Sequence, residues 1–269
     1  MSTKMLMTPK RFCRCVAGLL ILSLAVSAQA ANKAVEPVDR KDGWWVKRQA
    51  ENTEQMNKGD VELLLIGDSI THGWDKQKEL YDKFFGKYKP INLGFGGDQT
   101  QHVLWRLDHL PLDKIQPKVA QIMIGTNNIG TKTTTPKEAA EGIAAIVKKL
   151  QTQYPKLQII VLKVFPRDEK PDGERRKRVE EINSYLPAML KGLKNVELVD
   201  INAGFLDKEG NLPKTIMKDF LHPGKEGYEY WGGKVEPLIK AKFAQYDAPR
   251  DKQSRRGQRI LRPRNWLRG

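Results

Sequence analysis

The feature that most constrains the fold is a series of five short apolar runs, separated from one another by stretches with helical periodicity. One of them, QIIVLKV, is nearly continuous, as expected of a parallel strand that is buried on both faces. The five predicted strands are Val61–Ile66, Pro90–Leu93, Val119–Ile124, Gln158–Val164 and Val196–Asp200. The predicted helices are Lys76–Phe85, Gln101–Leu107, Pro136–Gln153, Arg175–Leu190 and Gly224–Phe243. This alternation predicts an α/β fold: a three-layer α/β/α sandwich around a doubly wound, mostly parallel five-stranded sheet.

The first thirty residues have the pattern of a secretory signal peptide. A basic start precedes the apolar run Val16–Val26, and Ala28–Ala30 forms a small-x-small cleavage site. The run is shorter than the about 20 apolar residues that a membrane span needs. Both cysteines, Cys13 and Cys15, lie in this segment, so the predicted mature protein has none for a disulfide, a metal site or a nucleophile. We expect an exported protein, periplasmic or secreted, with no transmembrane segment after the signal is removed.

The net charge of +15 is concentrated at the two ends of the chain. The predicted signal carries four basic residues and no acidic one, and Ala248–Gly269 carries eight basic residues and one acidic one. Only +4 remains on the body, so its charge gives no reason to expect a nucleic-acid partner. The C-terminal tail lacks apolar periodicity and is predicted to be disordered, and contact of this tail with an anionic surface stays open.

The chain divides into four predicted segments: a signal peptide (1–30), an N-terminal helical segment (31–58), one α/β domain (59–246) and the basic tail (247–269). The segment before the first strand contains GWWVKRQAENTEQM, which is expected to form a helix whose tryptophans pack against the domain. The body is long enough for one domain with a sizeable core. The sequence does not determine the oligomeric state.

Chemically distinctive residues follow the apolar runs where the predicted strands end. The first strand leads into Gly67-Asp68-Ser69, the second into NLGFGGDQT and the third into IGTNNIG. Near the C-terminus, DFLHPG places Asp219 three residues before His222. Because the carboxyl ends of parallel strands meet at one edge of the sheet, we expect these four segments to converge.

These residue types meet the requirements of acyl transfer. A serine needs a neutral imidazole to take its proton, and the imidazole needs a carboxylate to orient it; Ser69, His222 and Asp219 can fill these roles. The oxyanion needs fixed donors, which can be the backbone N–H groups of Ser69 and Gly97 and the side-chain amide of Asn127. Each motif alone also has a structural interpretation, as a helix cap or a tight turn. All four in this order favour catalysis.

The blocks GDSI, GFGGD, GTNN and DFLH together resemble the SGNH (GDSL-type) hydrolase superfamily. Within it, the chain is similar to the catalytic subunits of the platelet-activating factor acetylhydrolase Ib complex, over about Val61 to Phe243. The resemblance implies a flavodoxin-like SGNH hydrolase fold, no cofactor, and a small acyl pocket. The residues it implies are Ser69, Asp219 and His222 as the catalytic triad, Ser69, Gly97 and Asn127 as the oxyanion hole, and Ile70, Thr126 and Leu221 as the pocket.

Some assignments stay open at this level. Gly94, Gly96 and Gly97 are all candidates for the oxyanion glycine, and only alignment with the family favours Gly97. Asn128 stands where an aspartate is commoner in the superfamily, although the acetylhydrolase group shares the asparagine. His72 is a weaker candidate for the base, because no acid is apparent at a matching spacing, and is expected to line the cleft. With four histidines and no HExxH pattern, no metal site is expected.

The expectation is therefore an exported, cofactor-independent serine esterase that acts on short-chain, acetyl-type esters of a small molecule or glycan. Export favours an acetylated carbohydrate as the substrate, whereas the nearest resemblance favours a phospholipid-like acetyl ester. The alternative from another functional class is a non-catalytic SGNH-fold protein that binds acylated glycans or anionic envelope surfaces.

Overall fold

A computed structural model describes residues 31–130 and 134–248, so the predicted signal peptide and nearly all of the predicted tail lie outside the described residues. The centre is a five-stranded sheet with the order β2-β1-β3-β4-β5, in which every pair is parallel. This order is that of flavodoxin-like doubly wound folds, as the sequence predicts. The strands are β1 (Leu63–Gly67), β2 (Pro90–Gly94), β3 (Val119–Met123), β4 (Gln158–Leu162) and β5 (Val196–Val199).

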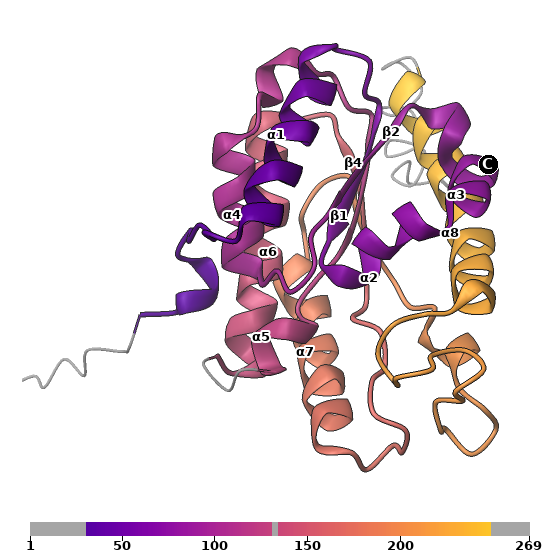
Figure 1. Ribbon diagram of the computed structural model, residues 1–269. Helices are drawn as coiled ribbons and strands as arrows, with labels where there is room; N and C mark the ends of the chain where they lie inside the picture. Colours follow the sequence, from indigo (N-terminus) through magenta and orange to yellow (C-terminus); the bar gives the residue numbers. More distant parts are fainter. Residues whose placement is uncertain (1–30, 131–133, 249–269) are drawn as a thin grey trace, which may run out of the picture. The chain divides into compact units, whose positions relative to one another are not determined.

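Helices cover both faces of this sheet and form the outer layers (Figure 1). One layer holds α1 (Gly43–Asn57), α4 (Thr100–His109), α6 (Pro136–Gln153) and α7 (Glu174–Leu190), and the other holds α3 (Lys78–Phe85) and α8 (Lys225–Asp247). Two short helices, α2 (Ser69–His72) and α5 (Thr126–Gly130), follow β1 and β3 almost directly. The 3-10 turns are η1 (Lys33–Val35), η2 (Gly73–Lys76), η3 (Gly86–Tyr88), η4 (Leu112–Lys114) and η5 (Asn202–Phe205).

Strand β1 shows why the apolar runs are continuous. Leu64 and Ile66 belong to the hydrophobic core under α4, α6 and α7, whereas Leu63 and Leu65 belong to the core under α3 and α8. All four side chains are completely buried. Since successive side chains of a strand point to opposite faces, a strand between two helical layers needs an apolar residue at every position.

All five predicted strands and all five predicted helices are present, with ends displaced by a few residues. Helix α6 has the predicted bounds because its first turn is capped: Glu138 N donates to Thr135 Oγ1 (3.2 Å), and Thr135 N donates to the Glu138 carboxylate (2.6 Å). The sequence does not predict the short helices α2 and α5, because a helix of four or five residues is too short to show a periodic apolar pattern.

The helix predicted before the first strand is α1, but only one of its two tryptophans packs inside. Trp45 is buried and contacts Phe95 and Trp105, with ring centroids 5.6 Å and 5.3 Å away. Trp44 packs against the domain only at its surface: its ring stacks on His72, with the centroids 5.9 Å apart, and the side chain stays 44% exposed. Adjacent helical residues lie about 100° apart around the axis, so one of the pair faces outward.

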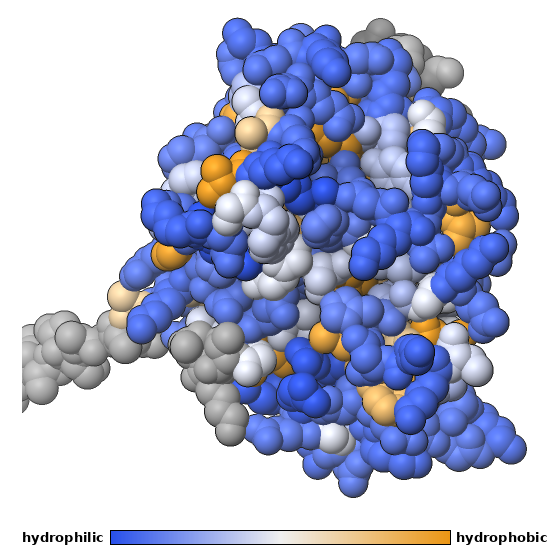
Figure 2. Space-filling model, viewed as in Figure 1, coloured by the Kyte–Doolittle hydropathy of each residue, from blue (hydrophilic) through white to orange (hydrophobic). Residues whose placement is uncertain are grey.

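The described surface is mostly polar. On the face drawn in Figure 2, hydrophobic residues form separate spots among hydrophilic ones. The exposed large hydrophobic side chains in the described part of the chain all belong to the N-terminal segment: Val35, Val38, Trp44 and Val46. None of the helices within residues 31–130 and 134–248 combines the length and the apolar character that a bilayer crossing requires.

Candidate active site

Three of the four sequence blocks begin at one level of the sheet. Gly67 at the end of β1 pairs with Gly94 of β2 on one side and with Met123 of β3 on the other. The segments that follow, beginning at Asp68, Phe95 and Ile124, therefore leave the same edge of three adjacent strands. This is the edge where ligands bind in doubly wound sheets.

The fourth block supplies a histidine to Ser69. The Ser69 hydroxyl lies 2.8 Å from His222 Nε2, and His222 Nδ1 lies 2.6 Å from Asp219 Oδ2. Since a charged Asp219 only accepts, Nδ1 carries the proton and Nε2 is left to accept from the Ser69 hydroxyl. The structure thus brings together the three residues that the sequence predicts, in a continuous chain of hydrogen bonds.

A tight turn holds Asp219 and His222 together. The backbone N–H groups of Leu221 and His222 donate to Asp219 Oδ1, at 3.1 Å and 2.8 Å. Phe220 has a positive φ of 56°, a strained conformation for a bulky residue. Desolvation alone raises the pKa of Asp219, but the hydrogen bonds from the His222 ring and the backbone outweigh it and lower the pKa below its ordinary value. Asp219 therefore stays charged at neutral pH.

Donors suited to an oxyanion lie on the neighbouring segments. The Asn127 side-chain amide donates to Asp98 O (3.0 Å), which fixes its orientation and leaves its second N–H available. Ser69 is the first residue of α2, where a backbone N–H has no partner within the helix. The Asp68 carboxylate caps the helix by accepting from Ile70 N (3.0 Å). This cap does not use the Ser69 N–H, which can therefore donate to an oxyanion.

The three candidate glycines have different structural roles. A Cβ at Gly94 would lie 2.1 Å from His72 N, so this glycine permits the close approach of α2 to β2. Gly97 has a φ of +76°, which favours glycine, and its backbone is exposed beside the site. A Cβ at Gly96 would meet other atoms only at ordinary van der Waals distances, from 3.6 Å upward. The geometry is compatible with Gly97 as the oxyanion glycine.

A buried ionic network around Asp98 holds the loop that contains Gly96 and Gly97. The sequence does not predict most of the residues in this network. Asp98 is fully buried and accepts hydrogen bonds from Trp45 Nε1 (2.8 Å), Arg106 Nε (2.8 Å) and Arg40 Nη1 (3.2 Å). Arg40 Nη1 also donates to Gly96 O (2.6 Å). Arg106 lies eight positions after Asp98, on α4, whereas Arg40 and Trp45 lie more than fifty positions away, so no local pattern identifies them.

Asn128 has a structural role that an aspartate cannot reproduce. It is fully buried, and its Nδ2 donates to Thr100 Oγ1 (3.0 Å) and Gln101 Oε1 (3.2 Å) while its Oδ1 accepts from Thr100 N (3.1 Å). A carboxylate has no N–H to donate. Asparagine, rather than the commoner aspartate, therefore suits position 128, because the acceptors at the start of α4 need an N–H donor.

His72 does have an acid nearby, contrary to the sequence expectation. Its Nε2 lies 3.5 Å from Asp75 Oδ2, three residues later in the chain, while its Nδ1 accepts from Gly96 N (3.3 Å). Burial is the main cause that lowers the pKa of His72, and the Arg48 charge adds to it. Since both ring nitrogens face other groups and Ser69 is bound to His222, His72 belongs to the wall of the site, as expected.

A cleft of about 450 Å³ opens beside the serine. Its lining includes Ser69, His222, His72, Asp75, Lys76 and Gln77. The three residues expected to bound an acyl pocket are not among those that line it. Ile70 and Thr126 are almost completely buried, with Thr126 Oγ1 accepting from Arg167 (3.0 Å), and Leu221 is half-buried.

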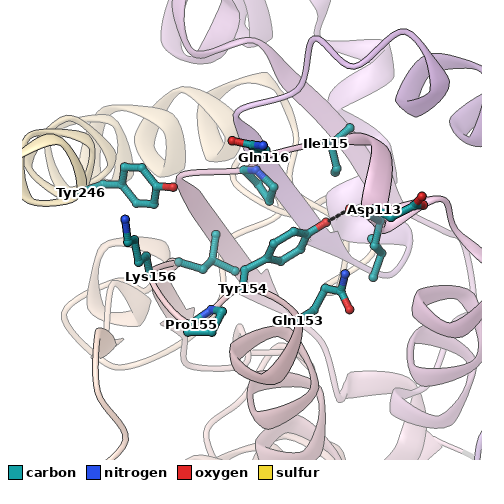
Figure 3. A pocket seen from close by; sticks show the side chains of 11 residues that line it. Asp113, Ile115, Gln116, Gln153, Tyr154, Pro155, Lys156 and Tyr246 are labelled. Atoms are coloured by element: carbon teal, nitrogen blue, oxygen red, sulfur yellow. Dashed lines mark hydrogen bonds between the residues drawn. The ribbon is translucent and has the colours of Figure 1, made fainter.

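A larger cavity of about 530 Å³ lies at the other end of the sheet, beside the residues that precede β3 and β4 (Figure 3). Tyr154 and Tyr246 line it, and the Tyr154 hydroxyl donates to Leu112 O. None of the residues singled out from the sequence lines this cavity. The described residues contain no group of three or more His, Cys, Asp or Glu side chains arranged to hold a metal ion.

Asp68, next to the serine, gives the protein a testable dependence of stability on pH. Burial raises its pKa from 3.8 to about 7, and nearby Asp98 raises it further, against the hydrogen bond from Ile70 N. Below pH 4 the residue is protonated in both states. Between about pH 4 and 7 only the unfolded chain ionises, so the free energy of unfolding falls as the pH rises, by about 4 kcal/mol. Above about pH 7 this loss is complete.

We therefore expect Asp68→Asn, which keeps an acceptor for Ile70 N, to lack this fall. Urea unfolding of both proteins at several pH values measures it. The wild type should lose stability relative to Asp68→Asn between about pH 4 and 7, with the difference constant above that range. Parallel curves across the whole range would contradict the raised pKa.

Comparison with known proteins places this arrangement in a family. The model of the GDSL-like Lipase/Acylhydrolase family matches residues 65–230. The chain is 38% identical to the platelet-activating factor acetylhydrolase IB subunit alpha2 of Gallus gallus over 181 residues, which is 67% of this chain and 77% of that protein. It is 37% identical to the subunit alpha2 of Homo sapiens over 195 residues, covering 72% and 82% of the two chains.

Solved structures share the fold. A GDSL-like lipase from Bacteroides thetaiotaomicron superposes with a TM-score of 0.60 at 20% identity, over 74% of this chain and 96% of that one. An acetyl-xylooligosaccharide esterase from Geobacillus gives 0.53 at 17% identity, over 64% and 91%. The family match and the relatives agree with the sequence blocks from Ser69 to His222. The chain therefore belongs to the GDSL-like lipase/acylhydrolase family, and it is a carboxylic ester hydrolase.

Proposed function

We propose that the protein is an exported serine esterase that cleaves short-chain, acetyl-type esters through Ser69, His222 and Asp219. The observation that carries this proposal is the hydrogen-bond chain from the Ser69 hydroxyl through His222 to Asp219, at 2.8 Å and 2.6 Å. It lies beside the loop of Gly97 and the amide of Asn127. Nucleophile, base, orienting acid and oxyanion donors thus lie at one edge of the sheet.

The first half of the reaction forms an acyl-enzyme. Ser69 Oγ attacks the ester carbonyl while His222 Nε2 takes the hydroxyl proton, and Asp219 stabilises the resulting imidazolium. The carbonyl oxygen becomes an oxyanion that accepts from the N–H groups of Ser69 and Gly97 and from the Asn127 amide. When the intermediate collapses, the bond to the leaving oxygen breaks and His222 returns its proton to the alcohol.

The second half releases the acid. Water attacks the acyl carbonyl while His222 Nε2 takes one of its protons, and the same donors bind the second oxyanion. Collapse breaks the bond to Ser69 Oγ, which recovers its proton from His222. The products are the free alcohol and the carboxylic acid, and the enzyme's protein groups return to their starting protonation.

Two observations support a short acyl chain. Ile70 and Thr126 are almost completely buried, so neither opens a groove beside the reacting carbon. Relatives that are 37–38% identical are named platelet-activating factor acetylhydrolase subunits, and one structural neighbour is named an acetyl-xylooligosaccharide esterase. Export is supported only by the signal-like pattern of residues 1–30.

A matched series of p-nitrophenyl esters tests the acyl preference. Each extra methylene gains only about 0.8 kcal/mol from burial, whereas forcing it into a packed pocket costs about 1–3 kcal/mol. We expect kcat/KM to fall steeply from acetate to octanoate, because the penalty for forcing in each methylene exceeds the gain from burying it. A wild-type enzyme that prefers octanoate would be incompatible with a small acyl pocket.

A further inference from the structure

An exposed tryptophan lies beside the nucleophile. The Trp44 indole is 44% exposed, and the Arg40 guanidinium lies 5.4 Å from its centroid. The His72 ring lies 5.9 Å away, with 22° between the ring planes. A Cβ at Gly96 would lie 3.6 Å from Trp44 Cη2, 3.9 Å from His72 Nδ1 and 4.0 Å from Ser69 Cβ. The side chains of Trp44, His72 and Ser69 therefore surround the space that Gly96, which has no side chain, leaves open.

His72 presents a hydrogen-bond donor next to this indole. Because its Nδ1 accepts from Gly96 N (3.3 Å), the neutral ring carries its proton on Nε2. Burial, followed by the charge of Arg48, lowers the pKa of His72 and favours this neutral form. Its ring lines the cleft beside Ser69, and Nε2 lies 3.5 Å from Asp75 Oδ2.

Asp75 presents an acceptor that is already held in place. Arg48 Nη1 donates to Oδ2 (2.6 Å) and Asn92 Nδ2 donates to Oδ1 (2.7 Å). Arg48 is fixed in turn by the Gly94 carbonyl (2.8 Å). The Asp75 side chain is nevertheless 43% exposed, and it lines the same cleft. A carboxylate held by its neighbours loses little conformational entropy when a ligand hydroxyl binds it.

We propose that Trp44, His72 and Asp75 form a subsite for the leaving alcohol, and that this alcohol is a sugar ring. The inference rests on the proposed function, because it assigns the alcohol side of the ester cleaved at Ser69. A sugar ring has apolar C–H groups that can contact an indole and hydroxyls that can bind a donor and an acceptor. The cleft has polar side chains, Asp75, Lys76 and Gln77, beside the ring surfaces of Pro223 and Tyr228, and this mixture suits a sugar ring, which has both hydroxyls and C–H groups.

Two esters with the same acyl group and different alcohols test the subsite: methyl 6-O-acetyl-β-D-glucopyranoside and glycerol monoacetate. In Trp44→Ala, we expect kcat/KM for the sugar ester to fall about tenfold relative to that for the glycerol ester, mainly through KM. Trp44→Phe should retain most of the preference, because it keeps an aromatic ring. Val46→Ala, a matched control at an exposed position of the same helix, should behave like the wild type.

An unchanged ratio in Trp44→Ala would overturn the subsite, and so would a wild-type preference for an acetylated alkyl-glycerophospholipid over the sugar ester. Calorimetric binding of the sugar ester to Ser69→Ala separates this inference from the esterase proposal. We expect binding that Trp44→Ala weakens about tenfold in the same background. If the wild type hydrolyses both esters, and Trp44→Ala changes neither the ratio of their kcat/KM values nor the binding of the sugar ester, the subsite alone is refuted. Trp44-dependent binding without any hydrolysis by the wild type would support the subsite and refute the esterase.

Discussion

Replacing Ser69 by alanine should abolish turnover of acetyl esters while leaving the protein folded. The hydroxyl lies 2.8 Å from His222 Nε2, and no other serine or cysteine in the described residues makes such a contact. We expect kcat to fall by at least about 10⁴ in Ser69→Ala and about equally in His222→Ala, because members of a triad act as a unit. Asp219→Asn should also lower kcat, since the amide alters which ring nitrogen of His222 carries the proton.

The controls distinguish lost chemistry from lost structure. Ser184→Ala removes an exposed hydroxyl on α7 and should retain wild-type kcat. Thermal unfolding of Ser69→Ala should match the wild type, because the half-buried hydroxyl contributes a single hydrogen bond. If His72→Ala proved as damaging as His222→Ala, the assignment of the base would be wrong.

The second large effect on kcat is expected when a donor is removed from the oxyanion hole. Asn127→Ala removes a donor that the Asp98 carbonyl holds in place at 3.0 Å. The loss of one such donor typically costs about 3–4 kcal/mol, so kcat should fall by about 10² to 10³ with little change in KM. Asn57→Ala, at an exposed amide near the end of α1, is the control and should be unaffected. A proportional rise in KM at constant kcat would instead indicate that Asn127 binds the ground state.

The sheet could be predicted from the sequence because each strand lies between two cores. Strands β1 and β4 are buried on both faces, and this requirement is visible residue by residue as an uninterrupted apolar run. Helix α6 was predictable because its capping box is local. The catalytic blocks were recognisable because each follows a strand end, and strand order brings three of them to one edge.

The parts that were not predicted depend on contacts between distant residues. Arg40 reaches Gly96 and Asp98 across more than fifty positions, so its role has no local signature. The sequence pattern does not reveal the pairing of His72 with Asp75, although the two residues lie three positions apart, because it depends on the turn between α2 and η2. The exposure of Trp44 beside a buried Trp45 depends on how α1 is rotated on the sheet, which composition does not reveal.

The central claim is that Ser69 is an activated nucleophile and that the protein is not merely a binder of acylated glycans or anionic surfaces. The most direct measurement is intact-mass and peptide analysis after reaction with a fluorophosphonate, which modifies serines that a neighbouring base activates. We expect one adduct per chain, on the peptide that contains Ser69, and none in Ser69→Ala. Labelling that persists in Ser69→Ala, or a folded wild-type protein that takes up no label, would contradict the claim.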